Sequence, residues 1–409
     1  MMMQQQKCQQ TEAVIVGAGP AGSYTALRLA LLGVKTDVYE EHPEIGLPSH
    51  CAGHISIHSL KKLGYYPLPK GIIENTFDAA NFYSPSGTKF SIHLKTPITC
   101  TLNRTKFDQH IANQAQKAGA TFHLNSPVQS LQIKNGYVKG VNLKNNTQVP
   151  SKITIDAEGI SSRLLHQTKL KGIEGKGLVY AVETEIDQVH DIEPHAVEVY
   201  MGSSAPGFYG WLIPRPDGSA KLGLATDHGN PQTCLKRLMT KHPVVKRQVK
   251  GAKIVKINYH AIPLAGPIRR AYGNGFLAVG DVASQVKPTT GGGVIFGLTC
   301  GGFAAKVVKS ALELGDVSAR SLSAYQKCCN DALSFDVSFM LRLRRFLGSL
   351  SDERWSSVLR FCSRFGVGEA LSGVEEIDYQ GKLMMQVAIK PAMLVTFGYF
   401  GLLYLFANP

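Results

Sequence analysis

A cysteine that could take part in chemistry lies in the sequence GLPSHCAGHIS, residues 46–56. A free thiol such as that of Cys51 can act as a nucleophile, a proton donor or a redox partner, or it can fill space as a small apolar side chain. A metal site is not expected, because His50 and His54 flank this cysteine without a fourth ligand. The role of the thiol therefore depends on what the fold brings to this loop.

A second candidate group lies in the sequence PGFYGWLIPR, residues 206–215, which is one of several strand-like runs in the middle of the chain. The rings of Tyr209 and Trp211 can stabilise positive charge on a bound molecule by about 1–2 kcal/mol, and the phenol can donate a proton. Ordinary packing within a sheet is the alternative interpretation. The turn-forming sequence at 216–219 predicts a hairpin between this strand and the next one.

The elements that position these residues begin with a glycine pattern near the N-terminus. Gly17, Gly19 and Gly22 fit the pattern G-x-G-x-x-G, which lets a backbone turn approach a pyrophosphate at the start of a helix. Glu40 follows at a distance that suits hydrogen bonds to ribose hydroxyls, and its charge disfavours a 2′-phosphate. The pattern therefore predicts a site for FAD or NAD rather than NADP.

The residues around this pattern predict a β-strand, an α-helix and a second β-strand. The expected elements are a strand at Val14–Val16, a helix that opens at Pro20 and Ala21 and ends at Gly33, and a strand at Val34–Tyr39. Further along, Arg104 precedes a predicted helix in which Thr105 and Asp108 have the spacing of a capping box.

A late glycine-rich segment favours FAD over NAD. Asp281 follows a predicted strand at Phe276–Val279, where its carboxylate can hold the ribityl chain of a flavin. A glycine run then opens an apolar helix. Its first amides, those of Gly292, Gly293 and Val294, could face the N1–O2 edge of the flavin, where negative charge accumulates on reduction.

These segments together resemble the p-hydroxybenzoate hydroxylase-type FAD fold. The glycine pattern, Glu40, Arg104, DAEGISSR at residues 156–163 and GDVA at residues 280–283 occur in the expected order. The resemblance implies an α/β (α+β) protein with a Rossmann-type FAD-binding domain that an antiparallel-sheet substrate domain interrupts. The expected boundaries are 1–74, 101–176 and 265–317 for the FAD-binding domain, 75–100 and 177–264 for the sheet domain, and 318–409 for a helical C-terminal region.

Within this fold the chain resembles the geranylgeranyl reductase family. The resemblance rests on CAGHIS at residues 51–56 and on the spacing Pro206-x-x-Tyr209-x-Trp211-x-x-Pro214. Where the family motif continues as Phe-Pro-Lys, this chain has Ile213-Pro214-Arg215. The family consists of FAD enzymes that saturate isoprenoid double bonds in archaeal ether lipids, in chlorophyll side chains and in related polyprenyl compounds.

The resemblance also implies roles for individual residues. Cys51, Ala52 and Gly53 are expected to lie at the flavin, together with Ala21 of the glycine pattern, and Cys51 is expected to take part in catalysis. The residues expected to meet a geranylgeranyl lipid are Pro206, Tyr209, Trp211, Pro214 and Arg215, with Tyr209 and Trp211 also expected to act in catalysis. The expected reaction transfers a hydride from reduced flavin to one alkene carbon and a proton to the other.

The expected function is a reductase of the archaeal ether-lipid type, and a reductase of another polyprenyl compound, such as a chlorophyll side chain, is an alternative within the family. Three functions outside the family also stay open at this stage. A flavin-dependent halogenase is one of them, because GWLIP partly matches a halogenase motif, although Tyr209 stands where that motif has tryptophan. A flavin-dependent monooxygenase is another. A non-catalytic protein that binds FAD and lipid is the third.

Charge is unevenly distributed along the chain, whose formal net charge is +14. No Asp or Glu occurs from His228 to Gly280, where ten basic residues lie: Lys236, Arg237, Lys241, Lys246, Arg247, Lys250, Lys253, Lys256, Arg269 and Arg270. A solvated helical face is one interpretation. The other is a surface for an anionic partner such as a membrane or an acidic redox protein. Nucleic acid is not expected, because no aromatic-rich binding motif accompanies the charge.

The electron donor stays open between a ferredoxin, a reduced deazaflavin and NAD(P)H, since the sequence has no second dinucleotide pattern. The eight cysteines include no CxxC pair, so neither a zinc site nor a disulfide framework is expected. Residues 1–12 lack the apolar core of a secretory signal and are expected to form a frayed leader, which favours a cytoplasmic location.

The C-terminal sequence PAMLVTFGYFGLLYLFA, residues 391–407, carries no charge. Its 17 residues stand at the lower limit for a membrane span. Its glycines and aromatic residues favour an interfacial helix or the wall of a substrate tunnel over a tail anchor or a core helix. The expected location is therefore the cytoplasmic side of a membrane, with peripheral attachment.

Overall fold

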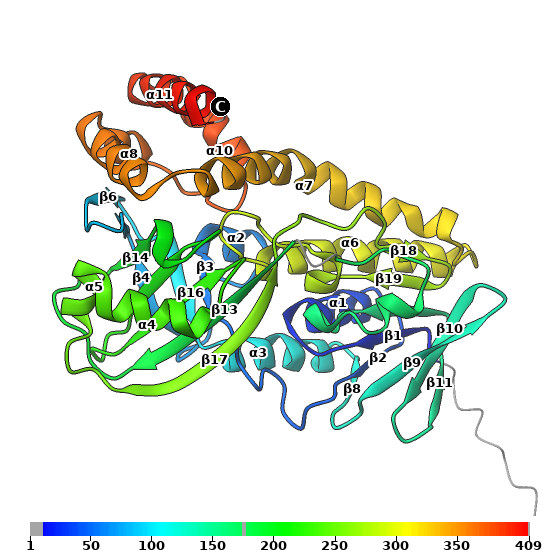
Figure 1. Cartoon of the computed structure of the whole chain (residues 1–409). Helices are drawn as coiled ribbons and strands as arrows, with labels where there is room; N and C mark the ends of the chain where they lie inside the picture. The colour runs from blue at the N-terminus through cyan, green and yellow to red at the C-terminus, as the bar shows by residue number, and fades with distance from the viewer. Residues whose placement is uncertain (1–10, 174–176, 408–409) are drawn as a thin grey trace, which may run out of the picture.

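The computed structural model describes residues 11–173 and 177–407, and the chain is arranged around two large β-sheets with a helical C-terminal region against them (Figure 1). The first ten residues of the expected leader and the predicted domain boundary at residue 176 lie outside the described residues. The mixed architecture confirms the predicted fold class, a Rossmann-type unit interrupted by a largely antiparallel sheet.

The first large sheet has six strands in the order β18-β19-β12-β1-β2-β8. Its strands are β1 (Ala13–Val16), β2 (Thr36–Tyr39), β8 (Thr121–His123), β12 (Ile153–Asp156), β18 (Tyr272–Gly273) and β19 (Phe276–Ala278). All neighbours pair in parallel except β18 and β19. β1 and β12 are buried along their whole length, so this sheet is covered on both faces.

Three helices pack around the glycine turn. They are α1 (Pro20–Leu31), α3 (Arg104–Lys117) and α6 (Val294–Glu313), and α1 packs against the other two. Gly17 has φ +98°, and a side chain there would lie 2.4 Å from the Ala157 carbonyl oxygen, so this turn requires glycine. The predicted capping box at Thr105 is wrong, because the Asn103 side chain accepts from the Lys106 amide and caps α3. A polar side chain two residues earlier takes the cap because α3 begins at Arg104.

The second large sheet has seven strands in the order β17-β13-β16-β15-β14-β5-β6. They are β5 (Ala79–Tyr83), β6 (Lys89–His93), β13 (Leu178–Ile186), β14 (Ala196–Tyr200), β15 (Gly210–Pro214), β16 (Ala220–Thr226) and β17 (Ile254–Pro263). All neighbours are antiparallel except β5 and β14, and the predicted hairpin joins β15 to β16. Helices α4 (Pro231–Lys241) and α5 (Pro243–Gln248) cover one face. The other face is left for the site.

Two small antiparallel sheets complete the strand structure. One, in the order β3-β7-β4, consists of β3 (His54–Ser56), β7 (Thr99–Leu102) and β4 (Ile73–Phe77), and α2 (Ile57–Lys62) follows β3. The other consists of β9 (Val128–Lys134), β10 (Tyr137–Leu143) and β11 (Gln148–Pro150). The first of these sheets carries the loop of Cys51 directly before β3, between the two large sheets.

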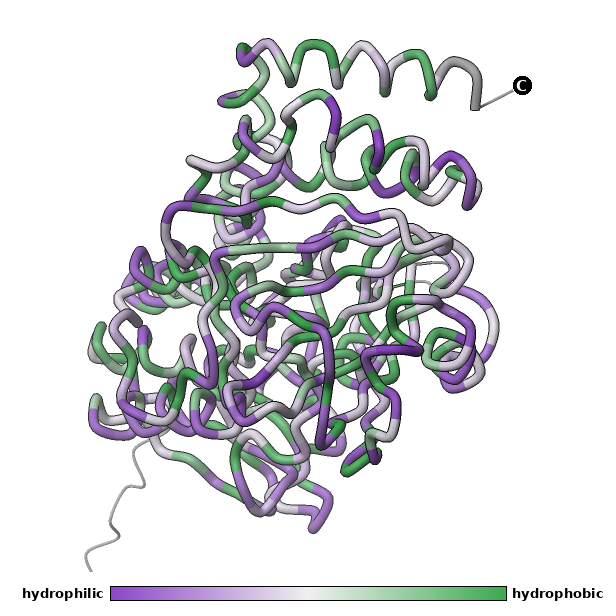
Figure 2. Tube along the Cα trace, turned by 90° about the vertical axis from the view of Figure 1, so that its left-hand side faces the viewer, coloured by the Kyte–Doolittle hydropathy of each residue, from purple (hydrophilic) through white to green (hydrophobic). Residues whose placement is uncertain are grey.

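The C-terminal region is helical, as expected. Its helices are α7 (Ala319–Gly348), α8 (Asp352–Arg364), α9 (Val367–Leu371), α10 (Gln380–Val387) and α11 (Pro391–Ala407). α7 packs along α6, and α10 packs against α7. α8 and α9 pack against β6, and α11 packs against α9 on the outer side (Figure 1). Figure 2 shows α11 at the outer edge of the molecule with hydrophobic residues along its length.

Two parts of the described chain are apolar and long enough to cross a membrane. α6 is one, and most of its apolar stretch is buried between other helices. α10 and α11 together are the other, but the chain bends by 118° between them. Length and composition therefore give weak evidence for a membrane span.

Candidate functional site

A cavity of about 870 Å³ lies where the two large sheets and the C-terminal helices meet. Its wall combines the glycine turn after β1, the Cys51 loop, the open face of the seven-stranded sheet and residues of α7, α9 and α10. Segments that are far apart in the sequence therefore share one chamber. Many of its polar lining residues come from the Rossmann-type unit, and its apolar lining residues come from the sheet and the C-terminal region.

The polar lining residues come largely from the Rossmann-type unit. The predicted cofactor residues that line the cavity are Gly17, Gly19, Ala21, Glu40, Cys51, Ala52, Gly53, Arg104, Asp281, Gly292, Gly293 and Val294. Gly22 is absent from the wall, because it packs against the glycine turn itself: a side chain there would lie 2.0 Å from the Gly17 carbonyl oxygen. These twelve residues were predicted from local patterns or, for Ala21, Cys51, Ala52 and Gly53, from the family resemblance, and the fold brings them to one cavity.

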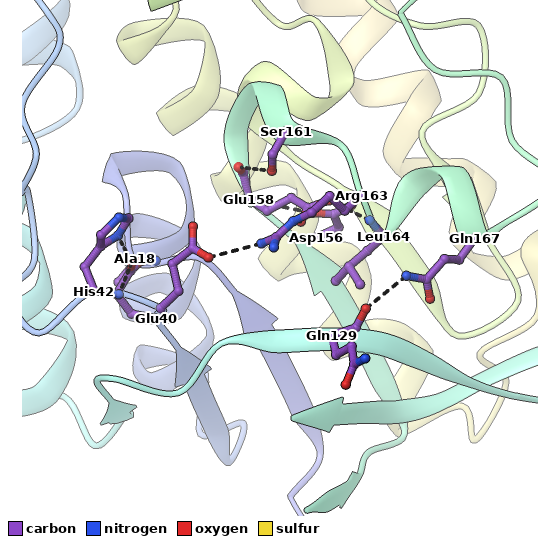
Figure 3. A network of polar contacts seen from close by, with 11 residues as sticks. Ala18, Glu40, His42, Gln129, Asp156, Glu158, Ser161, Arg163, Leu164 and Gln167 are labelled. Atoms are coloured by element: carbon purple, nitrogen blue, oxygen red, sulfur yellow. Dashed lines mark hydrogen bonds and ion pairs between the residues drawn. The ribbon is translucent and has the colours of Figure 1, made fainter. Parts of the chain in front are cut away.

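Glu40 is fixed at the end of β2 by its neighbours (Figure 3). Its carboxylate accepts a hydrogen bond from the Ala18 amide at 2.8 Å and contacts the His42 ring at 2.6 Å. Nearby, the Arg163 guanidinium pairs with Glu158 at 3.4 Å and with Glu41 at 3.3 Å. This edge of the cavity therefore offers ordered charged groups beside the glycine turn.

Arg104 links the Cys51 loop to α3. Its guanidinium makes two hydrogen bonds to the Asp108 carboxylate, at 3.0 and 3.1 Å, and also contacts the Cys51 thiol. Burial alone would lower the Arg104 pKa, but Asp108 and Cys51 raise it, so the guanidinium stays charged. Burial raises the pKa of Asp281, and the positive charge of Arg104 opposes that shift. The thiol therefore lies beside a permanent positive charge.

The residues of this polar region fit FAD. A side chain on Gly19 would meet nothing within 4 Å, so open space lies where the start of α1 would receive a pyrophosphate. At the start of α6 no side chain caps the helix, and among the described residues the amides of Gly292, Gly293 and Val294 donate no hydrogen bond. These amides are free to bind a negatively charged edge of a ligand.

The apolar lining residues come from the sheet and from the C-terminal helices. They include Phe82, Val199, Met201, Leu343, Leu347, Leu371, Val374, Leu383 and Met384. No residue of α11 up to Tyr404 belongs to this wall, so the tunnel-lining role expected for residues 391–407 falls instead to α7, α9 and α10. This apolar lining suits a hydrocarbon chain.

Tyr209 and Trp211 also line the cavity. Their rings meet edge to face, with centroids 6.1 Å apart, and the Tyr209 hydroxyl donates to the Thr290 carbonyl at 2.8 Å. Thr290 precedes the glycine run at the start of α6, so this hydrogen bond joins the sheet to the flavin-side loop. Burial raises the pKa of Tyr209, which makes the phenol a poor acid.

The cavity wall does not include Pro206, Pro214 or Arg215. The Arg215 guanidinium pairs with Glu185 at 2.9 Å and lies 3.7 Å from Glu74, so carboxylates of the protein already neutralise its charge. The expected contact of these residues with substrate stays a prediction.

Several polar residues of the site were not identified from the sequence. Glu183 of β13 lines the cavity and accepts from the Trp211 indole at 2.9 Å. Lys287, also in the wall, forms a buried ion pair with Asp378, which precedes α10. Both are single residues outside any motif. The strand register places Glu183 beside Trp211, and the C-terminal region brings Asp378 to Lys287. No group of three or more metal-ligating side chains occurs in the ranges that the structure describes.

Comparisons with known proteins agree with this site. Residues 10–298 match the model of the family described as FAD binding domain. The chain is 30% identical over 396 residues to digeranylgeranylglycerophospholipid reductase 2 of Methanopyrus kandleri, covering 94% of this chain and 97% of that protein.

Solved structures of flavoproteins are also similar to this chain. A geranylgeranyl bacteriochlorophyll reductase-like protein from Thermoplasma acidophilum has a TM-score of 0.83 at 26% identity, with 94% of this chain and 97% of that one covered. A flavin-dependent brominase has a TM-score of 0.70 at 19% identity, covering 96% of this chain and 98% of its own, which shows a shared fold alone. The chain therefore belongs to the FAD binding domain family and, within it, to the family of the digeranylgeranylglycerophospholipid reductases.

Proposed function

We propose that this protein is an FAD-dependent reductase that saturates the C=C double bonds of geranylgeranyl chains in ether phospholipids. The single observation that carries the proposal is the shared cavity. One part of its lining carries the residues that fit FAD, another part is largely apolar, and Cys51, Tyr209 and Trp211 belong to the same chamber. The family relationship supports the same substrate class, because the curated relative is named for a digeranylgeranyl phospholipid.

FAD, once bound and reduced, supplies hydride. The protein's own residues bind the cofactor, hold the isoprenoid and exclude water. Gly19 and the start of α1 receive the pyrophosphate, and Glu40 receives a ribose. The amides at the start of α6 stabilise negative charge on the flavin edge. The apolar wall holds the isoprenoid, since each buried CH₂ contributes about 0.8 kcal/mol, and it excludes water from the reacting carbons.

The aromatic pair and Cys51 act on the substrate in this proposal. Tyr209 and Trp211 present their rings to the alkene and stabilise positive charge on it by about 1–2 kcal/mol. Cys51, held against Arg104, borders the reacting end of the isoprenoid. Cys51, Tyr209 and Trp211 are therefore the residues to which we assign direct contact with substrate.

The test is an anaerobic single turnover. The purified holoenzyme is reduced chemically, mixed with digeranylgeranylglycerophospholipid, and followed by flavin absorbance and lipid mass spectrometry. Flavin reoxidation with a gain of two hydrogen atoms per double bond supports the proposal. Reoxidation that requires air and leaves the lipid unchanged overturns it in favour of an oxygenase or halogenase.

We also propose that an acidic redox protein of the ferredoxin class delivers the electrons. The basic edge, defined here as Lys246, Arg247, Lys250, Lys253 and Lys256, is exposed on α5, on the connection after it and at the start of β17. β17 is the edge strand of its sheet, and Asn258 and His260 of the same strand line the cavity. A partner docked on the basic edge would therefore lie beside the chamber that receives FAD.

Peripheral membrane attachment is the third part of the proposal. The lipid-facing surface, defined here as Met385, Ile389, Leu394, Leu402 and Tyr404 of α10, α11 and their connection, has side chains 55–81% exposed. Exposed arginines on the neighbouring helices, Arg342, Arg345, Arg360 and Arg364, suit anionic head groups. Because α10 also lines the cavity, insertion of this surface would place the chamber next to its lipid substrate.

A further inference from the structure

A buried carboxyl group lies in the cavity wall on β13, the strand next to the edge strand β17 of the seven-stranded sheet. The strand register places Asn258, Glu183, Gly223 and Trp211 in one row across β17, β13, β16 and β15. Glu183 is 5% exposed and belongs to the cavity wall, as do Asn258 and Trp211. The row therefore presents one acid to the chamber, with an uncharged amide on one side and an indole on the other.

Gly223 allows the indole to reach this acid. A side chain at Gly223 would lie 2.5 Å from Cζ2 and 2.6 Å from Cε2 of Trp211, so the indole lies directly across the glycine. The Trp211 Nε1–H then donates to the Glu183 Oε2 at 2.9 Å. Because Gly223 has no side chain, the Trp211 indole can lie over β16 and contact Glu183.

The charges around Glu183 are engaged elsewhere. The Lys221 ammonium of β16 donates to Glu74 at 2.8 Å and to the Ala52 carbonyl at 3.0 Å. The Arg215 guanidinium at the end of β15 pairs with Glu185 of β13 at 2.9 Å. Among the described residues, the Trp211 indole is the one group that hydrogen-bonds to the Glu183 carboxyl. Burial raises the pKa of Glu183 to about 7, against the opposing charge of Lys221.

The other candidate acids are less suited to release a proton. The Tyr209 hydroxyl already donates to the Thr290 carbonyl, and burial raises its pKa. The Cys51 thiol contacts the Arg104 guanidinium on the flavin side of the cavity. Glu183 alone combines a position in the wall beside Trp211 with a neutral form that exists near pH 7.

We propose that Glu183 is the general acid that protonates the alkene, an inference that rests on the proposed function. The hydride that reduced FAD supplies forms the C–H bond at one alkene carbon, and the Glu183 carboxyl proton forms the C–H bond at the other. The π bond breaks, the flavin returns to its oxidised state, and Glu183 is left as a carboxylate. The Trp211 N–H stabilises that carboxylate until a proton from solvent restores the acid.

The decisive variant is Glu183→Gln, which keeps the size of the side chain and an acceptor for Trp211 but has no proton to give. The matched control is Glu185→Gln, the same change on the same strand outside the cavity wall. Reduced holoenzyme is mixed anaerobically with digeranylgeranyl lipid across pH. The wild-type rate is expected to fall as pH rises through about 7, because the carboxyl loses its proton. Glu183→Gln is expected to be at least about 100-fold slower with no such inflection. Glu185→Gln is expected to keep the rate at low pH, with the inflection at a somewhat lower pH, because the Glu185 charge contributes to the raised pKa of Glu183.

A second readout does not depend on turnover. The chain has two tryptophans, so 5-fluorotryptophan labelling gives two ¹⁹F resonances, and Trp355→Phe identifies that of Trp211. In FAD-loaded enzyme the Trp211 resonance is expected to titrate near pH 7, and to be independent of pH in Glu183→Gln. FAD content and circular dichroism establish that each variant is folded.

The outcomes separate the two proposals. A wild-type enzyme that reduces lipid, together with a Glu183→Gln variant that keeps its rate and pH profile, overturns the role of Glu183 and leaves the proposed function intact. A Trp211 resonance that does not respond to pH also overturns it. A wild-type enzyme that reduces no geranylgeranyl lipid overturns both.

Discussion

The Lys221 ammonium donates a hydrogen bond to the Ala52 carbonyl at 3.0 Å. Lys221 belongs to the centre of the seven-stranded sheet, and Ala52 follows Cys51 in the loop that reaches toward the glycine turn. A second bond from the same ammonium goes to Glu74 at 2.8 Å. One buried side chain thus holds the Cys51 loop against the sheet that carries Trp211.

Replacing Lys221 should therefore change both stability and the titration of Glu183. In Lys221→Met the Ala52 carbonyl and Glu74 lose a partner, which should cost about 1–3 kcal/mol and lower the melting temperature. The pKa of Glu183 should rise, because the positive charge that opposes its shift is gone. The pH at which lipid reduction declines should then move upward. Lys236→Met, on the exposed side of α4, is the control, and an unchanged pH profile would contradict the prediction.

Gly19→Val should abolish FAD retention. A valine would occupy the open space at the start of α1 that the pyrophosphate needs, while nothing in the protein clashes with it. The fold should therefore survive without flavin, which the ratio of visible to ultraviolet absorbance measures. Gly348→Val, at an exposed glycine with equally open surroundings, should retain FAD and have the wild-type absorbance ratio. A Gly19→Val protein with full flavin content would refute the placement of FAD.

Cys51→Ala and Cys51→Ser should reduce turnover by about tenfold or more without loss of FAD. The thiol is exposed in the cavity wall and contacts Arg104, so the change alters the site but leaves the core unaffected. Turnover and flavin content are measured on the same samples. Cys328→Ser on α7 should match the wild type. Wild-type turnover in both Cys51 variants would reduce this residue to a packing role.

Membrane binding should depend on the lipid-facing surface. The double variant Ile389→Ser and Leu402→Ser should weaken binding to vesicles that contain anionic lipid by at least about tenfold, because both side chains would lose their burial in lipid. Cosedimentation measures the loss. Leu314→Ser, at a side chain 76% exposed at the end of α6, should bind as the wild type does. Equal binding by all three proteins would show that another surface meets the membrane.

Electron delivery should depend on the basic edge. Charge reversal in Lys253→Glu and Lys256→Glu should slow reduction by a reduced ferredoxin, and higher salt should slow the wild type in the same way. Stopped-flow flavin absorbance at several salt concentrations measures both effects. Lys134→Glu on β9 makes the same charge change outside the basic edge and should have no effect. If NADPH or a reduced deazaflavin reduces the enzyme quickly while ferredoxin does not, a small-molecule donor replaces this proposal.

The nucleotide-binding half of the site could be predicted from sequence, because its chemistry lies in short contiguous patterns. Gly17 and Gly19 lie in one turn, and only α1 and β2 lie between that turn and Glu40. Local sequence patterns therefore determine the spacing of these three residues. The start of α3 shows the limit of such rules. A capping box at Thr105 was plausible from spacing, but the helix begins at Arg104, two residues earlier than that cap would place it, and Asn103 caps it.

Glu183 could not be found in this way. It faces Trp211 because β13, β16 and β15 are neighbours in that order with a particular register, and because residue 223 is glycine. Neither register nor strand order is encoded in any one segment. The Lys287–Asp378 pair could not be found from a local pattern either, since its two members lie 91 positions apart in the sequence.

The match to the FAD binding domain ends at residue 298, whereas Leu343, Leu347, Leu371 and Val374 of the apolar wall all follow it. One part of the apolar wall is thus encoded after the matched segment, whereas Phe82, Val199 and Met201 of the same wall lie within it. Substitutions in α7, α9 and α10 can lengthen, shorten or reshape the compartment without disturbing the redox chemistry. A single ancestral flavoprotein could in this way give rise to enzymes that differ in the tail they accept while sharing one reaction.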